Sequence, residues 1–352
     1  MLSIGLYNAL VDFSFQSDSI LLNFKNNFIT NNMKIRISLF TVILSISSVS
    51  AQQSLRLNPP PSTAEIFGKN FISTGISERD FALSPDGTEL FYTIQSPLGI
   101  FQTIAYSKKD KSGNWSKPEI APFAGKFSDL EPAFTADGNK LFFSSNRPIS
   151  GSEIKDFDIW VVEKKNGIWG EPINLGSPVN TKEDEFYPSI AHSGNLYFTA
   201  AYQNGIGKED IFVSKWENGT YTVPVLLDTA VNSKSYEFNA FVSPEEDFII
   251  FTAYGRKDEK GRGDLYMSVK DAAGNWQPAK NLSMLNTAKL DYCPFVSFDK
   301  KILFFTSERI NIKNAFPENA VKINELRESF VSPQNGGGDI YWISFDKIME
   351  QF

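Results

Sequence analysis

Short hydrophobic runs separated by polar turns recur along this chain at a nearly fixed spacing. Each copy opens with an acidic residue, continues through a short strand, turns, and enters a hydrophobic strand that ends in aromatic residues. The five leading acids are Glu78, Asp129, Glu185, Glu237 and Asp291. They are separated by about 51 to 56 residues, a regularity that chance matches to a loose strand pattern would not produce. The pattern therefore indicates an internal repeat.

Each copy continues with a third strand and the beginning of a fourth. The third strand opens with Gln102 in the first copy and with Asp in the others, at Asp158, Asp210, Asp264 and Asp339. A turn containing Asn or Gly follows and leads to an aromatic residue, at Trp115, Trp169, Tyr221 and Trp276. Gly and Asn tolerate positive φ, so these turns predict hairpins. We interpret the aromatic residues mainly as packing residues, with stacking on sugars as the alternative.

Four antiparallel strands repeated about every 54 residues predict an all-β fold, a five-bladed β-propeller, with six blades as the alternative. A twisted four-stranded sheet has two apolar faces, and neighbours arranged in a ring cover both. The fifth copy ends soon after its third strand, whereas residues 64–73 lie before the first acid, where a fourth strand belongs. We therefore expect this N-terminal strand to pair into the last blade and close the ring.

The N-terminal region predicts export. Residues 33–51 combine a short basic head, an apolar run and a small-residue cleavage site before Gln52, which is typical of a signal peptide. We interpret residues 1–32 as an upstream extension from a start codon placed too early, and 52–352 as one propeller domain. The apolar run of about 12 residues is too short to span a bilayer, so we expect no stable membrane insertion. The expected location is the periplasm or the cell exterior.

The repeat resembles a known family. The resemblance is carried by the string Ser84, Pro85, Asp86, Gly87, Leu90, Phe91, Tyr92, by the Asp-Ile-Tyr triplets, and by the ending Gly337, Gly338, Asp339, Ile340, Tyr341, Trp342. These residues resemble the WD40-like PD40 repeat of TolB-type propellers, and the ending is similar to exported PD40 proteins of Bacteroidetes. The resemblance covers about residues 65–347 and implies the propeller fold. It leaves function open, because propellers carry unrelated activities.

Charge and composition narrow the partners. The net charge is −7, so nucleic acid would meet net repulsion, and we expect none as a partner. Cys293 is the only cysteine, which excludes an intramolecular disulfide. We expect a monomer that needs no cofactor or metal and binds a protein, a peptide or a glycan.

The leading acids are the candidate binding residues. In propeller geometry, residues just before each innermost strand lie around one mouth of the central channel, where Glu78, Asp129, Glu185, Glu237 and Asp291 would form a ring of carboxylates. We place Arg147, Arg256 and Arg309, which follow second strands, on the same face. The alternative is structural: each acid accepts a loop hydrogen bond or pairs with one of these arginines.

Catalytic residues are not identified. His192 is the only histidine and lies at a turn, which argues against a metal site of several histidines or a Ser-His-Asp triad. The favoured function is a binding module. One alternative is a carboxylate-dependent glycosidase, which needs only two acids, and another is a TolB-like envelope scaffold.

The fifth copy contains the largest departure from the repeat. Residues 310–338 insert about 20 extra residues between the second and third strands, and residues 320–330 have apolar positions on roughly one helical face. Binding often resides on loops carried by a rigid scaffold, so a helix there that caps the channel mouth is one interpretation, and a plain surface embellishment is the other.

Overall fold

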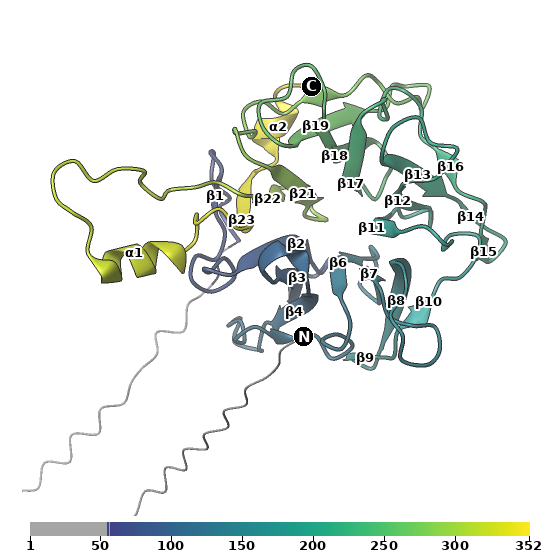
Figure 1. Cartoon of the computed structure of the whole chain (residues 1–352). Helices are drawn as coiled ribbons and strands as arrows, with labels where there is room; N and C mark the ends of the chain where they lie inside the picture. Colours follow the sequence, from purple (N-terminus) through teal and green to yellow (C-terminus); the bar gives the residue numbers. More distant parts are fainter. Residues whose placement is uncertain (1–54, 56) are drawn as a thin grey trace, which may run out of the picture. The chain divides into compact units, whose positions relative to one another are not determined.

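The five-bladed propeller predicted from the repeat is confirmed. The computed structural model describes Leu55 and residues 57–352, so the predicted signal peptide and upstream extension lie outside the described residues. The described chain forms five antiparallel sheets around a common centre (Figure 1), each with four strands in its main path. The first strand of each blade begins at the leading acid or one residue before it.

Blades 1 to 3 follow one another along the chain. Blade 1 consists of β2 (Ser77–Leu83), β3 (Glu89–Gln95), β4 (Gln102–Lys108) and β5 (Glu119–Ile120). Blade 2 consists of β6 (Asp129–Phe134), β7 (Lys140–Ser145), β8 (Asp158–Lys165) and β10 (Ile173–Asn174), with β9 (Ile168–Trp169) paired to β8. Blade 3 consists of β11 (Glu185–Ile190), β12 (Leu196–Ala200), β13 (Asp210–Ser214) and β16 (Val225–Leu226). A separate hairpin of β14 (Trp216–Glu217) and β15 (Thr220–Tyr221) leaves blade 3.

Blades 4 and 5 complete the ring. Blade 4 consists of β17 (Tyr236–Val242), β18 (Phe248–Tyr254), β19 (Asp264–Val269) and β20 (Lys280–Asn281). Blade 5 consists of β21 (Asp291–Val296), β22 (Ile302–Ser307), β23 (Asp339–Ser344) and, from the other end of the chain, β1 (Glu65–Ile66).

The predicted N-terminal closure is confirmed. Strand β1 pairs antiparallel with β23, placing Glu65 opposite Trp342 and Ile66 opposite Tyr341. The strand itself has only two residues, but Phe67 extends the contact: its N–H donates to the carbonyl of Ile340 over 2.8 Å. The Phe67 ring is 1% exposed and lies edge-on to Phe304, with 5.1 Å between centroids.

The core lies between the blades, where the repeated aromatic residues pack. Trp169 of blade 2 contacts Phe91 of blade 1 and Phe134 of its own blade, with ring centroids 5.8 and 5.9 Å apart. Trp115 and Trp276 are buried in the corresponding clusters. Packing, the favoured interpretation of these tryptophans, is therefore what the structure shows at three of the four repeat positions.

The insertion contains the expected helix but does not cap the channel. Helix α1 (Ile323–Phe330) begins three residues later than expected and has no buried residue. It lies outside the ring, away from the channel (Figure 1). Of the two interpretations, the structure therefore supports the surface embellishment: Ile323 and Phe330 of the helix are exposed and do not pack against the blades. The other helical segments are η1 (Pro97–Gly99) and α2 (Asp346–Met349), and no helix among the described residues is long and apolar enough to cross a membrane.

Candidate binding site at the channel mouth

The five leading acids hold the loops between blades. Their side chains are at most 1% exposed. Each accepts a hydrogen bond from the backbone N–H of the residue four positions earlier; these donors are Thr74, Gly125, Thr181, Ser233 and Thr287. In four blades the hydroxyl of that Ser or Thr also donates to the carboxylate. The geometry therefore supplies the loop hydrogen bond that the structural alternative expected, and ligand binding by these acids stays a prediction.

The three predicted arginines pair with three of these acids. Arg147 pairs with Asp129, and Arg256 donates to Glu237 from Nε over 3.0 Å. Arg309 is 3.6 Å from Asp291. In blade 3 the Tyr202 hydroxyl takes the place of an arginine and donates to Glu185 over 2.7 Å.

Burial determines the protonation of these acids. It raises the pKa of Glu78 to about 8 and that of Glu185 to about 7, against the loop hydrogen bonds, which lower both. Burial likewise raises the pKa of Asp129 and Asp291, although Arg147 and the Ser307 hydroxyl respectively oppose the shift. Carboxyl groups this buried serve the fold and offer little surface to a ligand.

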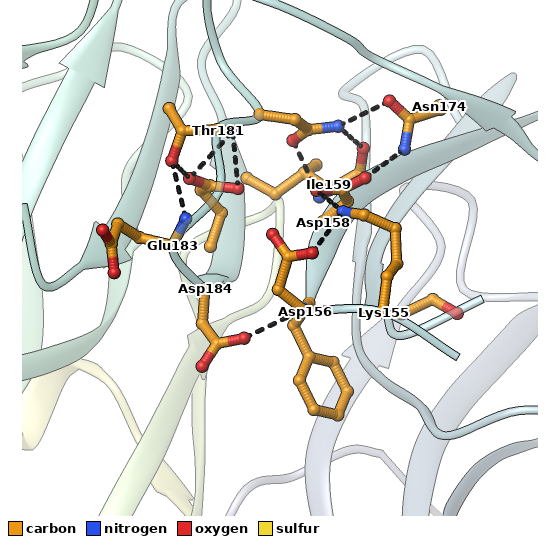
Figure 2. A network of polar contacts seen from close by, with 12 residues as sticks. Lys155, Asp156, Asp158, Ile159, Asn174, Thr181, Glu183 and Asp184 are labelled. Carbon is orange, nitrogen blue, oxygen red and sulfur yellow. Dashed lines mark hydrogen bonds and ion pairs between the residues drawn. The ribbon is translucent and has the colours of Figure 1, made fainter. Parts of the chain in front are cut away.

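A second set of polar residues fastens three of the connecting loops to the preceding blade. Figure 2 shows this network between blades 2 and 3, with Thr181 on the connecting loop and Asp158, Ile159 and Asn174 on blade 2. Asn180 accepts from the N–H of Ile159 and donates to its carbonyl, both over 2.9 Å. Asn232 and Asn286 repeat this pair of bonds on Ile211 and Leu265.

The Asp that opens each third strand also serves its own blade. Asp210, Asp264 and Asp339 accept backbone N–H bonds from the preceding loop. Asp158 instead pairs with Lys155 and accepts from the Asn174 side chain over 2.6 Å.

Two residues after each leading acid, the innermost strand contains a β-bulge. The register shifts at this point in all five blades. The bulged residues have left-handed φ values of 49° to 62° and form what we call the bulge ring: Asp80, Glu131, Tyr187, Asn239 and Cys293. A non-glycine residue in this region costs on the order of 1–3 kcal/mol, and such strain clusters at functional sites. The strand pattern of the sequence does not indicate this ring.

Contacts among blades show that the bulge ring meets at the centre of the propeller. Arg79 of blade 1 donates to Asp80 over 2.8 Å and to Glu131 of blade 2 over 3.1 Å. Glu131 also accepts from the Asn239 side chain of blade 4, over 3.3 Å, and from the N–H of Tyr187 of blade 3, over 2.7 Å. The Cys293 thiol of blade 5 lies 3.5 Å from the Asn239 amide oxygen. Side chains from four blades and a backbone N–H from blade 3 thus form one polar cluster.

The electrostatics of this cluster depend on one arginine and two acids. Burial and the neighbouring Asp80 raise the pKa of Glu131 to about 7, while Arg79 lowers it. Burial also raises the pKa of the Cys293 thiol, so it stays protonated at neutral pH. One oxygen of Asp80, Oδ2, is buried without a hydrogen-bond partner. Glu131 can therefore exchange a proton near neutral pH.

A hollow of about 280 Å³ opens above this cluster. We call it the channel-mouth hollow; its walls are Arg79, Gln102, Leu130, Glu131, Phe186, Thr199, Glu209, Phe238, Asn239, Leu290 and Tyr292. The Arg79 guanidinium lies 5.1 Å from the centre of the Tyr292 ring. None of the five leading acids lines the hollow. Among the described residues, no group of three or more His, Cys, Asp or Glu side chains is arranged to hold a metal ion.

Comparison with known proteins finds remote structural likenesses. No family model and no curated protein matches the sequence. TolB of Acinetobacter baumannii is 11% identical with a TM-score of 0.42; the match covers 76% of this chain and 55% of that one, so this chain spans about half of its length. A protein assigned as TolB from Agrobacterium tumefaciens is 13% identical with a TM-score of 0.45, and the match covers 76% and 90% of the two chains. An α-L-arabinofuranosidase from Lactobacillus brevis is 12% identical with a TM-score of 0.44, and the match covers 78% and 92%. Neither fold nor function follows from likenesses this remote; the propeller is established by the sheet topology of this chain.

Proposed function

We propose that this chain is a binding module whose ligand, a glycan or a peptide segment, enters the channel-mouth hollow. The observation that carries the proposal is the bulge ring. The fold uses its repeated acids in the same way in every blade, but the bulge positions carry five different residues in a strained conformation and direct them to one place. Strained backbone of this kind clusters at functional sites, which supports a site at the place where the ring meets. The predicted signal sequence is the support for action in the periplasm or outside the cell.

The walls of the hollow suit a polar ligand with an apolar face. Phe186, Phe238 and Tyr292 offer aromatic surface, and Arg79 and Glu209 offer opposite charges. Gln102 Oε1 and Thr199 Oγ1 have no hydrogen-bond partner. Pockets for small ligands commonly combine apolar walls with a few such polar groups.

Removing one aromatic wall should weaken binding. Phe238→Ala removes the ring without touching Arg79 or Glu131, and we expect a loss of at least about tenfold in affinity, equal to about 1.4 kcal/mol. Isothermal titration calorimetry with defined neutral and acidic oligosaccharides and with short peptide amides measures the affinity. Phe316→Ala, on the exposed insertion, is the matched control and should bind as the parent does. Equal affinity of both variants and the parent would place the ligand elsewhere.

A glycosidase is the second candidate, favoured by the acids that line the hollow. Glu131 has its pKa raised to about 7, and burial also raises the pKa of Glu209. A protonated carboxylic acid near neutral pH is what a general acid requires. Release of reducing sugar from the same oligosaccharides, lost in Glu131→Gln with binding retained, would favour the enzyme. Binding without release would favour the module.

A further inference from the structure

Three of the gaps between blades are filled by an indole. Trp115, Trp169 and Trp276 stand opposite Lys109, Lys164 and Lys270 across their hairpins. Each lysine ammonium lies over the indole of its partner, 4.8, 5.3 and 4.6 Å from the ring centre. The repeated unit is therefore a tryptophan sealed into a slot between two blades, with a cation above it.

Blade 3 departs from this unit at both positions. In the same cross-strand register, Tyr221 replaces the tryptophan and Trp216 replaces the lysine. The two rings lie edge to face, 4.7 Å apart. Trp216 is 45% exposed, whereas Trp115, Trp169 and Trp276 are at most 9% exposed. The indole has thus moved from the slot to its outer wall.

The slot between blades 2 and 3 is consequently open. It has a volume of about 500 Å³, and we call it the open slot. Phe142 and Ile190 line it; they occupy the repeat positions of Phe91 and Phe134, the residues that contact Trp169 in the neighbouring slot. Its other walls include Val161, Ile173, Leu175, His192, Trp216 and Tyr221.

Trp216 is held in place rather than loosely exposed. The backbone N–H of Trp216 donates to the side-chain oxygen of Asn195 over 3.1 Å. Gly194, with φ of +87°, lies directly beneath the side chain, and a Cβ there would come within 3.0 Å of it. The glycine therefore permits a close approach that fixes the indole as a wall.

The open slot also lacks the lysine that lies over the tryptophan in the three filled slots. In blade 1 the charge of Lys164 helps to lower the pKa of the turn residue Asp86. The corresponding residue of blade 2, Asp137, lines the open slot and bonds only within its own turn, to Thr135 and Asn139. It has no ion pair among the described residues. The nearby Lys140 is paired with Glu163, and His192 with Glu245.

We propose that the open slot binds an aromatic side chain of another protein, carried next to a lysine or arginine on an exposed segment. The three filled slots show which side chain fits between such blades, and the unpaired Asp137 supplies charge complementarity for the basic neighbour. The open slot shares no lining residue with the channel-mouth hollow, so the proposal is independent of the ligand there.

The test uses N-acetyl-Trp-Lys-amide as the probe, titrated into the full chain and followed by ¹⁵N NMR. We expect shifts at Gly194 and at the Trp216 indole. The double variant Trp216→Lys/Tyr221→Trp restores the lysine–tryptophan pair of the three filled slots, so it should fold. Because its own tryptophan would then fill the slot, it should bind the probe at least about tenfold more weakly. An equal affinity for the double variant and the parent overturns the proposal.

Charge complementarity has its own pair of variants. Asp137→Asn should weaken binding of this probe about threefold or more and leave binding of N-acetyl-Trp-Gln-amide unchanged. Asp86→Asn, the equivalent change beside a filled slot, should leave both affinities unchanged. Oligosaccharides that shift the Gly194 and Trp216 signals while the peptide does not would overturn the proposal in favour of a glycan site.

Discussion

At the scale of single residues, left-handed backbone conformation is the feature that organises the centre of this propeller. A bulge adds one residue to a strand and re-aims its side chain. In each blade it turns one residue toward the axis, where Glu131 meets Arg79 and Asn239. The leading acids lie only two residues away, yet they face the connecting loops. Within one strand, the leading acid therefore holds a connecting loop, whereas the bulged residue two positions later faces the central cluster.

Burial of the acids predicts a dependence of stability on pH. Glu78, Glu131 and Glu185 have folded-state pKa values of about 8, 7 and 7, above the ordinary value of 4.5. The folded state thus binds protons more tightly than the unfolded chain does. The stability from these groups is fully present below about pH 4.5 and is lost as the pH rises through about 7 to 8. Urea unfolding should therefore give a free energy of unfolding that falls from pH 5 to pH 8.

Glu78→Gln removes one of these groups and should flatten this profile. The slope should decrease by at most about 1.4 kcal/mol per pH unit, the limit for one proton. Glu318→Gln, on the exposed insertion, should keep the slope of the parent. A Glu78→Gln profile as steep as that of the parent would show that Glu78 ionises normally in the folded state.

At the scale of elements, four of the five loops between blades are fastened by side chains at both ends. The leading acid binds the loop to the following blade, and Asn180, Asn232 or Asn286 binds it to the third strand of the preceding blade. Ser73 does the same at the closure, accepting from the N–H of Ile340 over 3.0 Å. Backbone groups at the blade ends are satisfied in this way without further strand pairing.

Loss of one such asparagine should be costly. Asn232 is 1% exposed and bonds the N–H and carbonyl of Ile211 and the carbonyl of Leu227. Asn232→Ala leaves these buried groups without partners, and we expect a destabilisation of about 2–4 kcal/mol in urea unfolding. Asn319→Ala, on the exposed insertion, should change stability by less than about 0.5 kcal/mol. A loss no larger for Asn232→Ala than for this control would show that the loops are held by packing alone.

At the scale of the whole molecule, stability depends on joining the two ends of the chain. Strand β1 adds one short edge to blade 5, but Phe67 brings a fully buried ring into contact with blades 1 and 5, through Phe81 and Phe304. A ring of blades that fails to close leaves two apolar faces in water. The closure therefore affects every blade.

Deletion of residues 52–75 should abolish cooperative folding. The milder variant Phe67→Ala should cost about 3–5 kcal/mol, the usual range for a buried phenylalanine. Thermal unfolding followed by near-ultraviolet circular dichroism measures both. Leu98→Ala, at a fully exposed loop position, should leave the melting temperature unchanged. A deletion variant that melts at the parent temperature would show that the ring does not need this closure.

Much of the binding site was not readable from the chain. The sequence does contain a local signal for the loop hydrogen bonds of the leading acids. In four blades a Ser or Thr lies four residues before the acid, at Thr74, Thr181, Ser233 and Thr287. The bulge ring had only a weak signal: five unrelated residues at one repeat position. The direction of those side chains depends on a bulge that the strand pattern does not show.

The repeat, the propeller class and the closing strand could be predicted from the sequence, whereas the structure settled five blades over the alternative of six. These features follow from local preferences that recur: hairpin turns, alternating apolar positions and an unpaired edge at each end. Only the tertiary structure decided which side chains meet at the axis and which slot between blades stays open. Those outcomes depend on contacts among residues from different blades, and no single repeat contains the information about its neighbours that sets them.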